Sequence, residues 1–361
     1  MERNGFITKY TALGERLEKW LGGGTPWPQL EEAVRRSAED NAFFTPYMQR
    51  RALEAMAGAF LREEELRRWL GQYPEPLPGA GTDTCGIVAA GNIPAVGFHD
   101  ILTVLAAGWS PLVKLSSKDR HLLPVLFPPD SGVRFSSSTD GWEVDALLTM
   151  GGDTAAEFYR NHFNGIPKVV RSGKFSVAAV TGREDNAGLG ALAEDMLLYY
   201  GLGCRSATCL LVPEGYDFSG IMQAAGRFAA EYWGRPGKDN YRKNKAVLTL
   251  AGESFLDCGT VIFRNLRALI PGAEDDIGLC RAWGIPLHVG EVWYVEYASK
   301  EEMEKFIRVN MSRIQKIIRN FGHAQRPALD DWPDGTDTLG LLIEKQLKNH
   351  DTQIQSNYPR Q

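Results

Sequence analysis

The sequence of 361 residues predicts an α/β fold that is preceded by a helical segment. Two observations favour this class. From about residue 84 onward, short apolar segments alternate with segments whose apolar residues recur at helical spacing. Within that region, "CGIVAAGNIPAVGFHDILTVLAAGWSPLVKLSSKD" has the strand, turn, helix and strand order of a βαβ unit. The chain is 43% hydrophobic and 24% charged, as globular proteins are, and it is long enough for two packed domains.

The first 75 residues predict helices. In "TPYMQRRALEAMAGAFLREEELRRWLGQYP", apolar residues recur on one helical face, with Thr45 as a cap and Pro46 in the first turn. The segment 73–84 is rich in proline and glycine, which favour turns. We therefore expect the α/β region to begin after it.

The βαβ unit is predicted from a strand at 86–90, a turn with Gly91 and Pro94, a helix at 98–107 ended by Gly108, and a strand at 112–115. In such a unit the turn after the first strand faces the ligand crevice, and a small residue there lets a nucleotide approach the backbone. The spacing is not G-x-G-x-x-G, however. The alternative is a tightly packed turn without a ligand.

A second strand, turn and helix are predicted at "DALLTMGGDTAAEFYRNHF". Gly151, Gly152 and Thr154 precede or open its helix, where the first backbone N–H groups have no partner within the helix. Such groups can bind a phosphate. Two turns of this kind favour a nucleotide site more than one does.

Composition excludes several classes of function. The net charge of -5 argues against extended binding of nucleic acid. The start, "MERNGFITKYTALGERLEKW", is unlike a signal peptide, and no apolar run approaches the roughly 20 residues of a membrane span. Five cysteines without a C-x-x-C pair suggest neither a disulfide framework nor a metal site. We expect a cytoplasmic protein with a small-molecule partner.

Cys204 is the candidate nucleophile. It lies between a glycine-rich turn and a predicted strand in "YYGLGCRSATCLLV". Gly201 and Gly203 let the backbone approach a substrate, and Arg205 could stabilise a thiolate if its side chain turned toward the sulfur. The alternative is core packing, since free cysteine is among the most buried residue types. The other four cysteines are interpreted as structural: Cys85, Cys209, Cys258 and Cys280.

The motifs "AAGNIPAVG", "PLVKLSSKD", "TMGGDT" and "GLGCRS" occur in an order that resembles the aldehyde dehydrogenase superfamily. More narrowly, the chain resembles its acyl-CoA reductase branch, the fatty-acyl reductases related to those of bacterial luminescence, over about residues 41–342. The resemblance implies an aldehyde dehydrogenase-like fold, a cleft between two domains and usually a homo-oligomer. The expected division is a helical segment at 1–75, a Rossmann-like NAD(P)-binding domain at 76–180, a catalytic domain at 181–325 and a tail at 326–361.

The resemblance also assigns catalytic roles. It makes Cys204 the nucleophile and Asn92 the amide that holds the carbonyl oxygen, together with the backbone N–H of Cys204. An amide suits that task because it donates hydrogen bonds without titrating. The alternative for Asn92 is a hydrogen bond within its own turn.

Cofactor contacts are implied in the same way. Lys114 matches the superfamily lysine that contacts the adenosine ribose or its phosphate, and Ser116 and Ser117 follow it. Relatives that prefer NAD often have a glutamate where Ser117 stands. An uncharged serine beside Lys114 and Lys118 favours NADPH, with NADH possible, whereas the alternative is a solvated strand end.

Two departures from the superfamily pattern matter. Hydrolysing members carry a glutamate in E-L-G-G-K, where it acts as the general base. Residues 170–174 read V-R-S-G-K, so Val170 stands at that position and the base is missing. Glu157 also replaces a glycine of the phosphate turn. An enzyme without the base would reduce an acyl group better than it hydrolyses it.

The sequence therefore predicts an NADPH-dependent reductase of an acyl-CoA or acyl-protein thioester, with an acyl-transferring protein as a possible partner. Two alternatives stay open, a cysteine-dependent acyltransferase or thioesterase and a nucleotide-binding module without activity. The basic run 237–245 could contact coenzyme A phosphates, but a solvated turn is the commoner explanation. Four aspartates between 330 and 337 lack calcium-binding spacing, and His99 is interpreted as packing.

Overall fold

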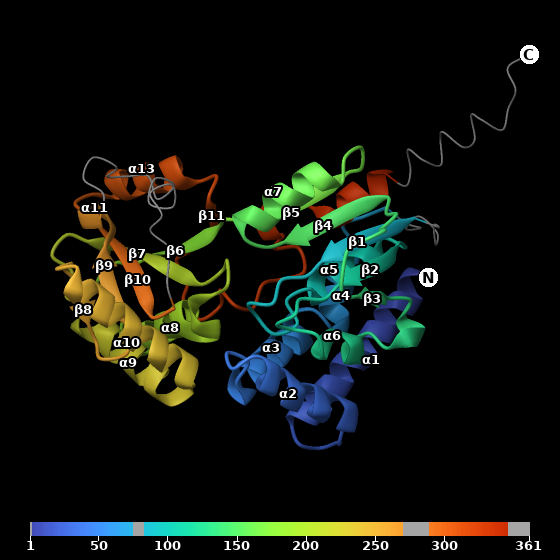
Figure 1. Cartoon of the computed structure of the whole chain (residues 1–361), viewed down its shortest axis with the longest axis horizontal. Coiled ribbons are helices and arrows are strands. Elements are labelled where there is room, and N and C mark those ends of the chain that lie inside the picture. Colours follow the sequence, from blue (N-terminus) through green and yellow to red (C-terminus); the bar gives the residue numbers. More distant parts are fainter. Residues whose placement is uncertain (1, 75–82, 270–288, 346–361) are drawn as a thin grey trace, which may run out of the picture. The chain divides into compact units, whose positions relative to one another are not determined.

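The structure is a computed structural model that describes residues 2–74, 83–269 and 289–345. Contacts divide the chain into two compact units, which we describe separately (Figure 1). Unit 1 comprises Met1–Asn41, Gln49–Gly173 and Pro327–Gln361. Unit 2 comprises Ala42–Met48 and Lys174–Arg326.

The chain begins with the predicted helices. They are α1 (Arg3–Leu21), α2 (Pro28–Asp40), α3 (Pro46–Ala59) and α4 (Glu63–Leu70). The predicted cap of α3 is present, since the backbone N–H of Met48 donates to Oγ1 of Thr45 at 3.3 Å. Acidic residues open α4 and arginines close it, an arrangement that complements the helix dipole.

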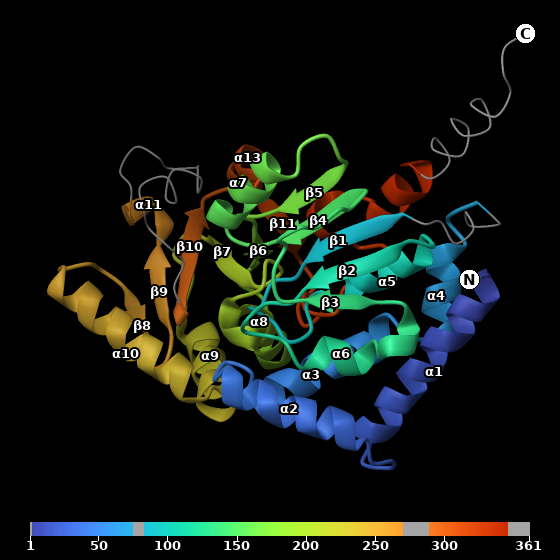
Figure 2. The ribbon, with the colours of Figure 1, turned by 45° about the vertical axis from the view of Figure 1, so that its right-hand side comes forward.

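Unit 1 contains a five-stranded parallel sheet of order β3-β2-β1-β4-β5 (Figure 2). Helix α5 (Phe98–Ala106) packs against β1 and β2, and α7 (Asp153–His162) packs against β4 and β5. Both predicted strand-turn-helix segments are thus present. The first two strands begin two residues earlier than predicted. The strands are β1 (Thr84–Val88), β2 (Ser110–Lys114), β3 (Arg134–Ser136), β4 (Ala146–Met150) and β5 (Lys168–Arg171), with the short α6 (Leu122–Leu126) and η1 (Pro129–Ser131) between β2 and β3.

Unit 2 contains a six-stranded sheet of order β11-β6-β7-β10-β9-β8, in which only the short β8–β9 pair is antiparallel. Its core includes Val177, Cys209, Trp293 and Phe306, all almost fully buried. The strands are β6 (Phe175–Ala179), β7 (Ala207–Pro213), β8 (Leu256–Asp257), β9 (Ile262–Asn265), β10 (Glu291–Tyr297) and β11 (Ile314–Ile318). The helices are α8 (Asn186–Leu197), η2 (Leu198–Gly201), α9 (Ser219–Tyr232), α10 (Arg235–Leu250), α11 (Leu266–Leu269) and α13 (Lys300–Asn310).

The unit boundaries differ from the divisions expected from sequence. Strand β6 pairs with β7 and β11, so the second unit begins at 174 and not at 181. Residues from 327 onward belong to unit 1 because they bond to it. His99 Nε2 lies 2.9 Å from the carbonyl oxygen of Leu329, and η3 (Pro333–Gly335) precedes Thr338, whose hydroxyl accepts from Arg171.

Among the described helices, none is long and apolar enough to cross a membrane. Cys85 and Cys209 are fully buried, as expected for structural cysteines, and Cys258 is partly buried. Cys280 lies outside the described residues.

Candidate functional site

Cys204 lies on the turn between η2 and β7 and is exposed. Its carbonyl oxygen accepts a hydrogen bond of 2.8 Å from the hydroxyl of Ser176, which anchors the turn to β6. The backbone N–H of Ser206 donates to the carbonyl of Gly203 at 3.0 Å and closes the turn. Cys209, five residues later, is buried in the core. Of these two cysteines, only Cys204 is accessible to a reagent.

The backbone before Cys204 is strained. Tyr199, Tyr200 and Gly201 have φ values of 55°, 60° and 72°, in the left-handed region. Glycine adopts this region freely, but a non-glycine residue there costs of order 1–3 kcal/mol, and such residues cluster at functional sites. Two consecutive tyrosines in this conformation must be held by contacts from elsewhere in the fold.

Contacts within unit 2 hold Tyr200. Its hydroxyl accepts a 3.0 Å hydrogen bond from the backbone N–H of Gly234. Its ring lies edge-on to Phe43, with centroids 5.0 Å apart, and 5.3 Å from the ring of Trp233. A side chain at Gly237 would collide with both the Tyr200 and Trp233 rings, so that position needs glycine. The strained turn is therefore fixed by aromatic packing.

The segment 42–48, which links α2 to α3, contributes to this packing. The backbone N–H of Tyr199 donates to Sδ of Met48 at 3.3 Å. Tyr47 stacks on Tyr232 with the ring centroids 4.0 Å apart. Sequence reasoning missed this role, because the contacts join residues 151 and 185 positions apart.

A buried carboxylate holds the segment 322–325, which contacts the Cys204 turn. Asp195 accepts from the backbone N–H groups of Gly322 and Ala324 at 2.7 and 3.0 Å. Burial raises its pKa to about 6, against the effect of these two donors. One residue further on, Nε2 of Gln325 donates to the Ser206 hydroxyl at 3.1 Å. The segment 322–325 is thereby attached to α8 and to the Cys204 turn.

Asn92 lies in unit 1, in the loop between β1 and α5, and is partly buried. The loop packs directly on the segment after β2. A Cβ added to Gly91 would lie 2.2 Å from Oγ of Ser116 and 2.9 Å from Cβ of Lys118. Only glycine fits there. Gly91 thus allows a close approach between two loops at the ends of neighbouring strands, which is the tightly packed turn given above as the alternative to a nucleotide contact.

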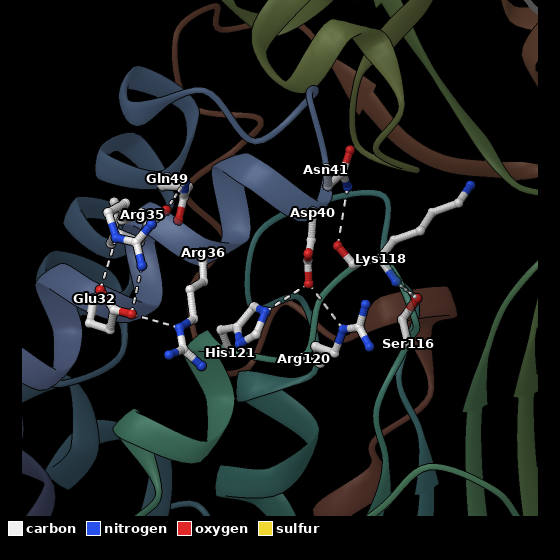
Figure 3. A network of polar contacts seen from close by, with 11 residues as sticks. Glu32, Arg35, Arg36, Asp40, Asn41, Gln49, Ser116, Lys118, Arg120 and His121 are labelled. Carbon is white, nitrogen blue, oxygen red and sulfur yellow. Dashed lines mark hydrogen bonds and ion pairs between the residues drawn. The ribbon is translucent and has the colours of Figure 1, made fainter.

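Lys114 is the last residue of β2 and is partly buried, whereas Ser117 and Lys118 are exposed. Oγ of Ser116 accepts from the backbone N–H of Lys118 at 3.2 Å and shapes the turn. Figure 3 shows the Lys118 side chain extending away from this turn. The backbone carbonyl oxygen of Lys118 accepts a 3.2 Å hydrogen bond from the side-chain amide of Asn41.

The end of α2 also binds Arg120 and His121, which follow Lys118 closely in the chain (Figure 3). Oδ2 of Asp40 lies 2.8 Å from Nε2 of His121 and 3.1 Å from Nε of Arg120. This contact lowers the pKa of Asp40, chiefly through the hydrogen bond from His121. The segment 118–121 is therefore held at its start by Asn41 and at its end by Asp40.

Gly151, Gly152 and Thr154 are exposed at the start of α7. Gly152 is the cap residue, and a Cβ there would meet no atom within 4 Å. The space beside Gly152 is therefore open, and the first N–H groups of α7, which have no partner within the helix, could bind a phosphate. Glu157, which stands where the superfamily pattern has a glycine, is exposed on the second turn of the helix.

The candidate cofactor residues share one edge of the unit 1 sheet. Strand β1 lies between β2 and β4, and Val88 is in register with both Lys114 and Thr149. The loops with Asn92, Ser116 and Gly151 all follow the carboxyl ends of these strands, where open α/β sheets bind ligands. Cys204 is in unit 2. Among the described residues, no cluster of His, Cys, Asp and Glu side chains suits a metal ion.

The structure is similar to solved aldehyde dehydrogenases. Aldehyde dehydrogenase 21 from Physcomitrella patens, in complex with succinate, matches 94% of this chain and 84% of its own, with 11% identity and a TM-score of 0.63. Glyceraldehyde-3-phosphate dehydrogenase GapN from Methanocaldococcus jannaschii, complexed with NADP, matches 94% and 79%, with 15% identity and a TM-score of 0.57. A propionaldehyde dehydrogenase from Clostridium phytofermentans matches 96% and 80%, with 9% identity and a TM-score of 0.52.

The chain has the aldehyde dehydrogenase fold. The fold class expected from the sequence is thus confirmed. No protein-family model matches the sequence, and a search of curated proteins finds no match. The narrower resemblance to acyl-CoA reductases stays a prediction.

Within the aldehyde dehydrogenase fold, Val170 stands near the carboxyl end of β5, in register with Thr149 of β4. Neither residue has an ionisable side chain. Gly173, three residues later, has a positive φ of 68° and is the last residue before unit 2 begins. The residue that the superfamily pattern would make a base therefore cannot accept a proton here.

Two further expectations have clear outcomes. The basic run 237–245 is not a turn but part of α10, and one of its cations, Lys245, pairs with Asp257 at 2.7 Å. Pro236 near the helix start and the packing of Gly237 on the aromatic rings explain the difference. His99 packs between the rings of Phe60 and Trp332, as expected.

Proposed function

We propose that this protein is an oxidoreductase that converts an acyl thioester, of coenzyme A or of an acyl-carrier protein, to the aldehyde with NADPH. The observation that carries the proposal is the exposed Cys204 on a strained, braced turn in a chain with the aldehyde dehydrogenase fold. Neighbours of this fold include enzymes named for their aldehyde substrates, and one is complexed with NADP.

The residues of unit 1 fit a dinucleotide. The uncrowded Gly152 and the exposed start of α7, with Gly151 and Thr154 beside it, suit a phosphate. Lys114, Ser116 and Ser117 would take the adenosine ribose. The exposed turn offers the Lys118 cation and, at residue 117, a serine in place of a carboxylate, which favours the 2′-phosphate of NADPH over the free hydroxyl of NADH. The bound cofactor would supply a hydride.

The chemistry of the protein groups follows from their types. The Cys204 thiolate would attack the thioester carbonyl, forming a C–S bond and breaking the one to coenzyme A, which leaves as a thiolate and takes up a proton. Asn92 and the Cys204 N–H would hold the oxyanion. After reduction of the acyl-cysteine, collapse of the thiohemiacetal would break the remaining C–S bond and release the aldehyde. The sulfur would leave as a thiolate, and the hemiacetal proton would be given up.

The absence of a base at Val170 favours reduction over hydrolysis. Water attacks an acyl-cysteine slowly unless a side chain accepts its proton, an effect worth typically 10²–10⁴-fold. The acyl-enzyme would therefore persist until it is reduced. The thioesterase or acyltransferase alternative would need another base, or an acceptor nucleophile from a partner protein.

A single assay separates the candidates. Purified protein is mixed with a chain-length series of acyl-CoA thioesters and NADPH, while NADPH absorbance and free thiol are followed together. A reductase consumes NADPH and releases thiol in equal amounts. A thioesterase releases thiol without consuming NADPH, and a nucleotide-binding module does neither. Size-exclusion chromatography with light scattering tests the proposed homo-oligomer.

A further inference from the structure

Asp119 is a buried carboxylate outside the proposed chemistry. It lies in the segment after β2 and is only 3% exposed. Its Oδ2 accepts a 2.6 Å hydrogen bond from the backbone N–H of Ala95. Its Oδ1 is buried and has no hydrogen-bond partner within the part of the chain that the structure describes. Burying a carboxylate with one oxygen unsatisfied is unfavourable, so its presence calls for an explanation.

The partner of Asp119 has an unusual backbone. Ala95 is fully buried and has a φ of 53°, in the left-handed region that glycine would adopt without strain. Its carbonyl oxygen accepts from the N–H of Phe98 at 2.9 Å, at the start of α5. Ala95 thus forms the bend between Asn92 and the helix, and a short hydrogen bond to the Asp119 carboxyl group holds that bend.

Other contacts of the loop are made by backbone and by small side chains. The N–H of Ala89 donates to the carbonyl of Lys114 at 3.0 Å, and Gly91 packs against Ser116. These contacts fix the loop up to Gly91. Beyond it, Asp119 supplies the side-chain hydrogen bond to Ala95, three residues after Asn92. Burial raises the pKa of Asp119 to about 7, while the Ala95 N–H opposes the shift.

We propose that Asp119 is a positioning residue for Asn92. Its carboxyl group holds Ala95 in the left-handed bend and so fixes the loop of unit 1 that carries the Asn92 amide. Asp119 itself touches no substrate. The inference rests on the proposed function, since it assumes that Asn92 stabilises an oxyanion.

Rates of acylation test this role without NADPH. Wild type, Asn92→Ala, Asp119→Ala and the double variant are mixed with acyl-CoA, and the first equivalent of thiol is followed by quench-flow. We expect Asp119→Ala to slow acylation by roughly 10–100-fold when Asn92 is present, because a small displacement of a catalytic group has effects of that size. With Asn92 already replaced, the same change should slow it less than about 3-fold.

Two further measurements separate positioning from general stability. Hydrogen exchange of a peptide covering 91–97 should accelerate in Asp119→Ala. Adding Ala95→Gly to that variant should restore part of the acylation rate, because glycine adopts the left-handed bend without strain. Asp217→Ala is the matched control. That exposed carboxylate also accepts from a backbone N–H, of Ser219 at 2.9 Å, and its loss should leave acylation unchanged. If Asp119→Ala does not fold, Asp119→Asn replaces it in the cycle, and its weaker acceptor should slow acylation by roughly 3–10-fold only when Asn92 is present.

Equal slowing by the Asp119 variant in both backgrounds, or none in a folded variant, would overturn the positioning role and leave the proposed function intact. A wild type that releases no thiol from any acyl-CoA would overturn both.

Discussion

Arg171 and Asp100 form a buried ion pair in unit 1, in which one guanidinium nitrogen lies 2.8 Å from each carboxylate oxygen. Arg171 ends β5 and is 5% exposed, and Asp100 lies in the first turn of α5 and is 2% exposed. The second terminal nitrogen of the guanidinium donates to the hydroxyl of Thr338 at 2.9 Å. The pair therefore joins the helix that follows Asn92 to the sheet and to the last described segment.

Breaking this pair on one side should be costly. Asp100→Asn leaves the Arg171 charge buried without its counter-ion, and we expect it to lower the free energy of unfolding by roughly 3–5 kcal/mol. The double variant Asp100→Leu, Arg171→Met removes both charges and should lose much less. Urea unfolding followed by tryptophan fluorescence measures both. A single variant as stable as wild type would show that the pair contributes little.

Tyr200 should affect the cysteine through its hydroxyl. Tyr200→Phe keeps the ring but removes the acceptor of the Gly234 N–H, so we expect about 1 kcal/mol less stability and a several-fold change in the rate at which iodoacetamide alkylates Cys204. Tyr241→Phe is the control, because it also removes a tyrosine hydroxyl that makes a hydrogen bond within unit 2, in this case by donating to Asp257 at 2.9 Å. Equal alkylation rates in Tyr200→Phe and wild type would contradict a role in shaping the turn.

Cofactor preference should depend on the exposed turn after β2. Wild type should have a higher kcat/KM for NADPH than for NADH. Ser117→Glu should reduce the NADPH value by about tenfold or more, because it places a carboxylate beside the 2′-phosphate, and Lys118→Ala should reduce it less. Lys243→Ala on α10 is the control for loss of a surface cation. Equal use of both cofactors by wild type, unchanged in Ser117→Glu, would refute the assignment.

Asp119 should make stability depend on pH. Its pKa is about 7 in the fold and near 3.9 in an unfolded chain, so the unfolded chain ionises first as the pH rises. The contribution of Asp119 to stability is thus fully present below about pH 4 and is lost as the pH rises to about 7. Relative to Asp119→Asn, wild type should lose up to about 4 kcal/mol across this range. Parallel stability curves for the two proteins would contradict this.

Local patterns in the sequence were sufficient for much of the fold. Apolar runs and glycine turns predicted β1, α5, β2, β4 and α7, because those elements are set by residues adjacent in the chain. The strands begin earlier than predicted because Thr84 and Ser110 pair in the ladder although they precede the apolar runs, and β1 ends earlier because Ala89 and Ala90 continue its apolar run beyond the ladder. The sequence favours a turn at 237–245, within α10, because its glycine and asparagines favour turns unless tertiary packing stabilises a helix.

The candidate site was predicted less completely. The sequence pointed to Cys204 through its flanking glycines, and exposure of the thiol agrees with that choice. Nothing local predicted left-handed tyrosines, since contacts from segment 42–48 and from Gly234 impose that conformation. The hydrogen bond between Asp119 and Ala95 joins two loops that only the folded sheet brings together. Neither an aspartate nor an alanine in such a loop predicts the contact from sequence.

The most direct test of the central claim is thiol release from acyl-CoA in the absence of NADPH, measured by quench-flow with mass spectrometry of the protein. We predict one rapid equivalent of thiol per chain, an acyl group on the peptide that contains Cys204, and its release as aldehyde when NADPH is added. Cys204→Ala should show none of these, whereas Cys209→Ala should retain them. Steady release of thiol over many turnovers with free carboxylic acid and no aldehyde, or acyl labelling that survives in Cys204→Ala, would contradict the account.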